Sequence, residues 1–158
     1  MTAIVLETYL LKSMNDKNQS NKLLVKAFIN AVNNRNWDML DNIVAEDFVR
    51  HSFAAGEPSL KCRGDLIQYL RTQESIFPKF KETILDLVAE GDKVATRQQF
   101  KGTQLGQMGP YPASCKDMNL EYLAIYQIIN GSITEAWVEW DNYTSMKQLG
   151  HMDMIKQN

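Results

Sequence analysis

Two carboxylates and an indole alternate near the end of the chain, in Trp137, Glu139 and Asp141. The stretch 133–141 that holds them is rich in β-branched and aromatic residues, which favour a strand. Because side chains alternate along a strand, these three share one face and the residues between them share the other. We therefore expect both carboxylates to face an enclosed space and to exchange protons with a bound molecule.

Asp141 is the candidate general acid/base of this group. Burial between Trp137 and Trp140 would raise its pKa by disfavouring the charged form. Glu139 lies about 6.5–7 Å away by strand rise, and its charge would push one pKa of the pair further upward. The alternative is that Asp141 caps a helix expected over 143–149, a common role for Asp, and the two roles are compatible.

Further polar candidates come from other predicted strands. His51 alternates with apolar neighbours, which is typical of a core histidine as well as of a catalytic one. Arg97 lies inside a strand and needs a carboxylate if it is buried, although a solvated outer face fits it equally well. Tyr122 and Tyr126 share one strand face and are expected to form pocket wall or core.

The strongest local structural signal is Asn130-Gly131, a pair that tolerates the positive φ angles of a tight hairpin turn. We expect strands 120–129 and 133–141 on either side of this turn. The other expected elements are a helix capped by Ser20, a short helix capped by Asn36, strand 48–53, helix 64–77 ending at Pro78, strands 80–89 and 94–101, and a closing helix 143–149.

Length and order predict the organisation of the chain. Its 158 residues suit one domain over residues 20–158, preceded by an N-terminal extension over residues 1–19 and a polar joint at 15–21. Helices come first and long antiparallel strands last, which indicates an α+β fold with helices over the concave face of a curved sheet. Such a cone has an apolar interior with one open end. We expect the irregular stretch 102–117 to lie at that end.

Composition excludes several classes of function. A net charge of -2 gives no basic footprint for nucleic acid or for an anionic membrane surface. Cys62, Cys115, His51 and His151 lack the spacing of a metal site, so no zinc site is expected. No export signal or apolar run of about 20 residues is present, and we expect a cytoplasmic protein.

Several phrases, in this order and spacing, resemble the SnoaL-like polyketide cyclases of the NTF2-like (cystatin-like) superfamily over roughly residues 20–150. They are Phe48-Val49-Arg50-His51, Phe77-Pro78, Glu90-Gly91-Asp92-Lys93-Val94-Ala95, Gly102-Thr103, Asn130-Gly131, Ile133-Thr134-Glu135-Ala136-Trp137, Trp140-Asp141 and Gln148-Leu149-Gly150. The resemblance implies an α+β cone and a homodimer. It also implies an intramolecular aldol reaction on a small hydrophobic molecule, without cofactor or metal.

By position, the resemblance assigns the acid/base role to Asp141 and a pocket histidine to His51, as a partner of the aspartate or of a substrate oxygen. The expected substrate-binding residues are Trp137, Glu139, Arg97, Tyr122 and Tyr126. The chain departs from the family where it has Ala136-Trp137-Val138, Gly102-Thr103-Gln104 and Pro112-Ala113-Ser114. Because these changes fall at polar positions, the alternative function is the binding of a hydrophobic ligand without catalysis.

Overall fold

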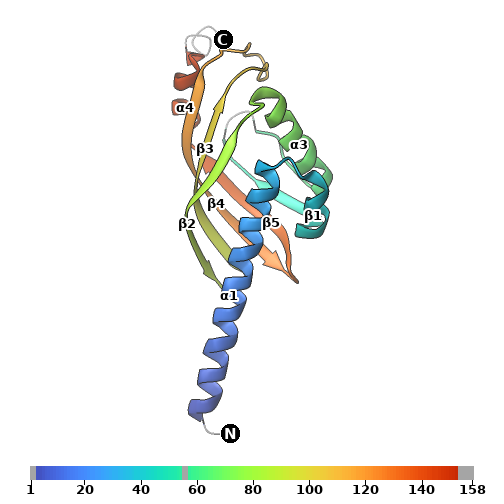
Figure 1. Cartoon of the computed structure of the whole chain (residues 1–158), viewed down its shortest axis with the longest axis vertical. Helices are drawn as coiled ribbons and strands as arrows, with labels where there is room; N and C mark the ends of the chain where they lie inside the picture. The colour runs from blue at the N-terminus through green and yellow to red at the C-terminus, as the bar shows by residue number, and fades with distance from the viewer. Residues whose placement is uncertain (1–2, 55–56, 153–158) are drawn as a thin grey trace.

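A computed structural model of the chain describes residues 3–54 and 57–152, with only the backbone of residues 3–10. The elements, in chain order, are helix α1 (Ala3–Asn33), 3₁₀ helix η1 (Trp37–Met39), helix α2 (Leu40–Ile43), strand β1 (Val44–His51), helix α3 (Arg63–Ile76), strands β2 (Lys81–Glu90), β3 (Lys93–Thr103), β4 (Asp117–Ile129) and β5 (Ser132–Trp140), and helix α4 (Asn142–Leu149). Figure 1 shows α1 and α3 beside a strongly curved sheet.

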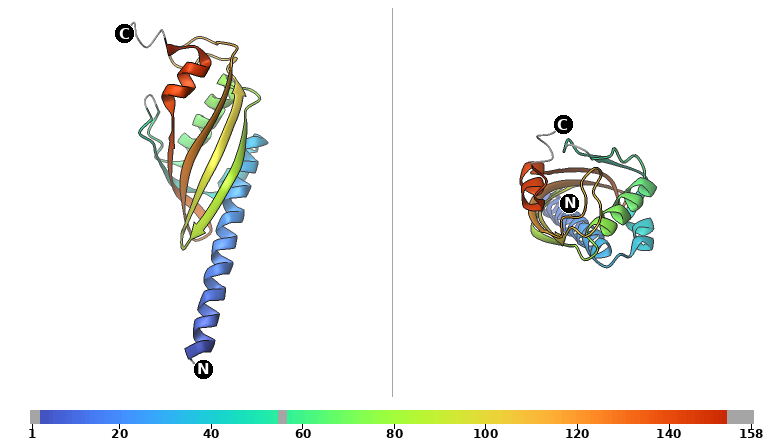
Figure 2. Two further views of the ribbon diagram at one scale, coloured as in Figure 1. Left: turned by 90° about the vertical axis from the view of Figure 1, so that its left-hand side faces the viewer. Right: turned by 90° about the horizontal axis from the view of Figure 1, so that it is seen from above.

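The five strands form one curved sheet in the order β1-β5-β4-β3-β2. Every neighbouring pair is antiparallel except β1 and β5, which run parallel. Figure 2 shows the sheet curling around the helices without closing, seen from the side and from above. The predicted α+β cone with helices over the concave face is confirmed, with β1 as the one parallel addition.

The β4–β5 hairpin turns where the sequence predicted. Asn130 and Gly131 have φ angles of 51° and 78°, the positive values that a primed two-residue turn requires. The turn pairs Ile129 with Ser132. The register changes once, between Gln127 and Ile128. The turn and this irregularity together decide which side chains of the last strand face inward.

Helix α1 begins at Ala3, so the expected helix start at Ser20 and the polar joint at 15–21 are wrong. The stretch 15–21 has no glycine or proline to interrupt a helix. Most of it is exposed, and Asn21 at its end is buried, where its side chain donates to the Gly91 carbonyl at 3.0 Å. Residues Leu11 and Met14 are exposed, and Figure 1 shows this half of α1 extending beyond the sheet. Only the second half of the helix packs on the domain.

The core lies between the concave face of the sheet and the helices. Helix α1 contributes Val25, Phe28 and Val32, and α3 contributes Leu66 and Leu70. The predicted cap of the short helix is confirmed, because the Asn36 side chain accepts a hydrogen bond from the Met39 amide. The helices thus roof the cone with apolar residues.

The irregular stretch between β3 and β4 is fastened to the end of α3. The amides of Leu105 and Gly106 donate to the Ile76 carbonyl at 2.9 and 3.0 Å. A Cβ on Gly106 would lie 2.3 Å from the Ser75 carbonyl oxygen, so only glycine allows this approach. Within residues 3–54 and 57–152, no helix is long and apolar enough to cross a membrane.

Candidate functional site

The strand face that carries Trp137 and Glu139 is the outer one. On β5 the inward residues are Ala136, Val138 and Trp140, all of which border the interior cavity. The predicted alternation is therefore present, but the assignment of the faces is wrong. The physical reason is that Ala136 and Val138 offer an apolar surface to the core, whereas carboxylates stay in water.

Asp141 caps helix α4 and lies exposed at the end of the last strand. Its Oδ1 accepts from the Thr144 amide at 3.0 Å, and the Thr144 hydroxyl donates to Oδ2 at 2.5 Å. These hydrogen bonds, that of the hydroxyl first, lower its pKa. The expected sheltered position and raised pKa are thus wrong, and the alternative of a helix cap is confirmed.

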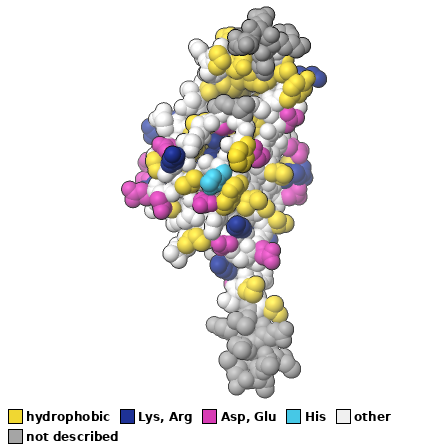
Figure 3. Space-filling view, turned by 180° about the vertical axis from the view of Figure 1, so that it is seen from behind, with side chains coloured by type: hydrophobic (Ala, Val, Ile, Leu, Met, Phe, Trp, Pro, Cys, Tyr) yellow, Lys and Arg dark blue, Asp and Glu magenta, His cyan; other side chains and the backbone are white. Residues whose placement is uncertain are grey.

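His51 and its neighbours form a cluster on the outer face. The His51 ring stacks on Trp137 with 5.2 Å between centroids, and its Nε2 lies 3.5 Å from a Glu135 oxygen. Glu139 is exposed and accepts from the Phe53 amide at 2.7 Å. Figure 3 shows a histidine among hydrophobic and charged side chains on this face. The structure therefore does not bring His51 to Asp141 or to the cavity.

Arg97 finds carboxylate partners, but on the outer face as well. Its Nε lies 2.7 Å from Asp86 and its Nη1 lies 2.7 Å from Glu121. These hydrogen bonds, that of Glu121 first, raise its pKa. Arg97 points away from the cone, so it is the expected alternative of a solvated outer face that the structure shows, and Arg97 does not bind substrate in the cavity.

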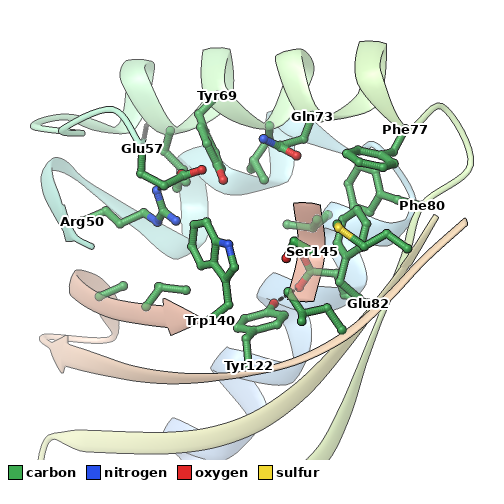
Figure 4. Close-up of a pocket in the computed structure, with 18 of the residues that line it drawn as sticks. Arg50, Glu57, Tyr69, Gln73, Phe77, Phe80, Glu82, Tyr122, Trp140 and Ser145 are labelled. Atoms are coloured by element: carbon green, nitrogen blue, oxygen red, sulfur yellow. Dashed lines mark hydrogen bonds and ion pairs between the residues drawn. The ribbon is translucent and has the colours of Figure 1, made fainter. Parts of the chain in front are cut away.

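A cavity of about 170 Å³ lies inside the cone, between α3 and the concave face of the sheet. Most of its wall is apolar, including Phe48, Phe77, Phe80, Phe100, Leu120 and Met146. Six of its polar residues are Arg50, Glu57, Tyr69, Gln73, Glu82 and Tyr122. Figure 4 shows these side chains converging from α3, β1, β2, β4 and the loop between β1 and α3. A mostly apolar pocket with a few convergent polar groups is typical of a small-molecule site.

Of the expected substrate-binding residues, Tyr122 and Tyr126 do line this cavity. Each hydroxyl belongs to a hydrogen-bonded chain with Gln98, whose side chain is fully buried on β3. The Gln98 amide donates from Nε2 to Tyr126 at 2.9 Å and to Thr96 at 2.7 Å. The Thr96 hydroxyl donates in turn to the Ala124 carbonyl at 3.2 Å.

Glu82 is one of the cavity residues that were not predicted from the sequence, as are Arg50 and Glu57. It projects from the edge strand β2 into the cavity, where the Tyr122 hydroxyl hydrogen-bonds to its Oε2. Burial raises the pKa of Glu82, against the opposing effects of the Tyr122 hydrogen bond and of the charges of Arg50 and Arg35. A carboxyl whose pKa moves toward neutrality is suited to proton transfer.

The direction of the hydrogen bonds links Glu82 to this chain. Because Thr96 gives its proton to Ala124, the Gln98 amide nitrogen must face Thr96 and its oxygen must face Tyr122. The Tyr122 hydroxyl lies 3.0 Å from that oxygen and also touches Glu82. One hydroxyl proton serves one acceptor at a time. Tyr122 therefore donates to Gln98 when Glu82 is protonated and to Glu82 when it is ionised.

The second polar group of the cavity is centred on Arg50 of β1. Its Nη1 donates to Glu57 at 3.0 Å, and its guanidinium lies over the rings of Tyr69 and Trp140 at 4.7 and 5.4 Å. Burial raises the pKa of Tyr69 and the charge of Glu57 raises it further, while the charge of Arg50 opposes the shift. Among the described residues, no cluster of three or more His, Cys, Asp or Glu side chains has the arrangement of a metal site.

The sequence and fold match known proteins over most of their length. A sequence model of the SnoaL-like polyketide cyclases matches residues 22–149. TsrD from Streptomyces laurentii is 25% identical with a TM-score of 0.74, covering 85% of this chain and 97% of its own. IdmH from Streptomyces antibioticus is 26% identical with a TM-score of 0.73, covering 82% and 98%.

An LEH-like epoxide hydrolase from M. tuberculosis shares the fold, at 19% identity and a TM-score of 0.68, covering 90% of this chain and 99% of its own. No curated protein matches the sequence. Since the family match spans most of the chain and the same cone recurs in the solved structures, this chain belongs to the SnoaL-like polyketide cyclase family.

Proposed function

We propose that the protein is a cofactor-independent enzyme that transfers protons next to the carbonyl group of a small hydrophobic substrate. The observation that carries this proposal is the Glu82 carboxyl, which is hydrogen-bonded to Tyr122 inside an apolar cavity and has a raised pKa. Membership of a family of cyclases supports an enzymatic use of the pocket.

The proposed step balances within the site. The ionised Glu82 carboxylate takes a proton from the carbon next to the carbonyl, and the electrons of that C–H bond form the C=C bond of an enolate. The carbonyl π electrons move to oxygen. Protonated Glu82 then returns the proton, either to the same carbon or to another position. Enolate formation is the first step of an aldol ring closure and also of an isomerisation. Both reactions would therefore begin with Glu82 and its hydrogen-bond partner Tyr122.

Deuterium exchange tests the proposal without knowledge of the natural substrate. Acetophenone or cyclohexanone is incubated with the protein in D₂O, and proton NMR follows the loss of the signal next to the carbonyl. We expect exchange above the buffer rate, and a loss of about 10²–10⁴-fold in Glu82→Gln. Glu90→Gln, an exposed position on the same strand, is the matched control and should exchange like the unaltered protein.

The second candidate function is the binding of a hydrophobic ligand without chemistry. It is favoured by the fact that the side chains of Gln98, Thr96 and Tyr122 already find hydrogen-bond acceptors within the protein. It predicts saturable binding of the same ketones with exchange at the buffer rate, and that result would overturn the enzymatic proposal. The homodimer and the cytoplasmic location expected from the sequence stay predictions.

A further inference from the structure

Arg50 is a buried cation held in one orientation. Its side chain is 6% exposed, and the rings of Tyr69 and Trp140 lie on it at 4.7 and 5.4 Å. Its backbone is also fixed, because the Arg50 amide donates to the Leu60 carbonyl at 3.0 Å. A guanidinium held against aromatic rings loses little further freedom on binding a ligand.

Most of the donors of this guanidinium have no hydrogen-bond partner among the residues that the structure describes. An arginine has five N–H donors, and the hydrogen-bond partner of Arg50 among the described residues is Glu57, through Nη1. Arg50 Nε and Nη2 do not belong to the buried polar atoms that lack a partner in the described part of the chain, so both atoms are accessible from the space around them. Since Arg50 lines the cavity, these donors are available to a molecule inside it.

The unused donors and Glu82 lie on different sides of the same space. Figure 4 shows Arg50 and Glu57 at one side of the pocket and Glu82 at the other, with Tyr69 and Trp140 between them. A substrate that fills the cavity can therefore meet a proton acceptor at one point and a hydrogen-bond donor at another. Donors aimed at an oxygen that gains charge are a main source of stabilisation in enolate-forming reactions.

Charge and volume limit what this site accepts. Glu57 offsets the charge of Arg50 at 3.0 Å, so an anionic group beside Arg50 would also meet the carboxylate of Glu57, and that of Glu82 when ionised. The volume of about 170 Å³ is close to that of a cavity of about 150 Å³ that holds benzene. The space therefore suits a single ring with a short substituent.

We propose that Arg50 donates a hydrogen bond to the carbonyl oxygen of the substrate, and that Glu57, by offsetting its charge, makes the site select neutral one-ring carbonyl compounds over carboxylates. The identity of the oxygen as a carbonyl rests on the proposed function. The position of the donors, the charge balance and the size limit rest on the geometry of the cavity.

Binding measurements test the selection for neutral molecules. Calorimetric titrations compare acetophenone with 4-acetylbenzoate, which adds one carboxylate to the same ring. We expect the unaltered protein to bind acetophenone at least about tenfold more tightly than 4-acetylbenzoate. In Glu57→Gln the charge of Arg50 is no longer offset, so the ratio of the two affinities should change by about tenfold in favour of the carboxylate. Equal binding of the two compounds to the unaltered protein, or an unchanged ratio in Glu57→Gln, would overturn the selection.

Infrared spectroscopy tests the contact with Arg50 directly. Acetophenone labelled with ¹³C at the carbonyl should show a C=O stretch at lower frequency when bound than in hexane, because its oxygen accepts a charged hydrogen bond. The double variant Arg50→Met/Glu57→Gln removes both partners and leaves no unpaired buried charge. We expect it to lose most of the frequency shift and to bind acetophenone about tenfold or more weakly.

Two further variants keep this test decisive. Arg97→Met/Glu121→Gln removes an ion pair of the same kind on the outer face and should leave both the shift and the affinity unchanged. Arg50→Lys retains the charge but loses the planar set of donors, so a reduced shift in this variant supports the contact if the double variant does not fold. A carbonyl frequency that is the same in the unaltered protein and in Arg50→Lys would overturn it.

The tests of the role of Arg50 can fail independently of the test of the proposed function. The binding ratio and the carbonyl frequency require no turnover, whereas the exchange of protons in D₂O does. Normal binding and a lowered carbonyl frequency without exchange would reject the enzymatic proposal and keep the role of Arg50. If exchange depends on Glu82 but the carbonyl frequency does not change in the Arg50 variants, the role of Arg50 is rejected and the enzymatic proposal is kept.

Discussion

The side chain of Asn33 holds both backbone polar groups of Glu82. Asn33 Nδ2 donates to the Glu82 carbonyl at 2.8 Å, and the Glu82 amide donates to Asn33 Oδ1 at 2.8 Å. Strand β2 is an edge of the sheet, so these two groups would otherwise lack a strand partner on that side. The last residue of α1 thereby sets the position of the one carboxyl proposed to carry protons.

Asn33→Ala should therefore lower both stability and proton exchange. The loss of two hydrogen bonds predicts a decrease of about 1–3 kcal/mol in the free energy of unfolding, measured by urea denaturation. Exchange of acetophenone protons should fall as well, since Glu82 loses its anchor. Asn34→Ala is the control, because the hydrogen bonds that the Asn34 side chain makes within the described part of the chain go to Asn30, at the exposed side of the same helix end. A loss of stability equal in the two variants would reject the anchoring role.

The raised pKa of Glu82 predicts how stability changes with pH. Above the ordinary value of 4.5, the unfolded chain releases the Glu82 proton while the folded protein still holds it. Stability from this group is thus present at low pH and falls as pH rises toward the folded pKa. In Glu82→Gln this fall should be absent, so the variant should gain stability relative to the unaltered protein between pH 4 and pH 8.

Urea midpoints measured over that pH range in both proteins give the difference directly, because other groups contribute equally to each. Glu90→Gln provides the comparison for the loss of a carboxylate that is exposed on the same strand. A difference between Glu82→Gln and the unaltered protein that stays constant with pH would show that the Glu82 pKa is not raised.

The architecture was predictable because it depends on local signals. Asn130-Gly131 specified the hairpin, Pro78 followed the end of α3, and alternation marked the strands. The alternation also grouped side chains correctly, since Trp137 and Glu139 do share a face. It did not say which face points inward, because that depends on what the helices cover. On β1 the same ambiguity hid Arg50 and favoured His51.

Glu82 escaped prediction for a different reason. The pairing of β2 with β3 shifts between Ile84 and Asp86, and such an irregularity interrupts the period-two pattern. Glu82 and Ile84 before the shift belong to the same partly buried series as Leu87 and Ala89 after it. If one irregular position is allowed for, Glu82 falls in the same series as these apolar residues.

The predicted helix start at Ser20 was wrong because a polar stretch can be helical in water when it has no glycine or proline.

Asp141 is expected to act through helix α4. Asp141→Ala should lower the urea midpoint because Thr144 loses the acceptor for its amide, whereas Asp141→Asn should retain most of the stability, since Asn caps helices well. The contribution of the carboxylate is present above its ordinary pKa of 3.8 and is lost as pH falls through the lowered folded value. Exchange of acetophenone protons in Asp141→Asn should equal that of the unaltered protein, and a large loss would return the acid/base role to this residue.

Tyr122→Phe should move the pH dependence of proton exchange. The hydrogen bond from Tyr122 lowers the Glu82 pKa against the effect of burial, so its removal should raise that pKa further. A general base works in its ionised form, and the exchange rate therefore rises with pH through the pKa of Glu82. The rise should occur at higher pH in Tyr122→Phe, as shown by exchange rates measured at intervals between pH 4 and pH 9.

Tyr126→Phe is the control for this prediction. It removes a hydroxyl that bonds to Gln98 at 2.9 Å and leaves the bond between Tyr122 and Glu82 intact, so its pH profile of exchange should coincide with that of the unaltered protein. Equal shifts in the two variants would mean that the hydroxyls act through the shared Gln98 chain rather than through direct contact with the base.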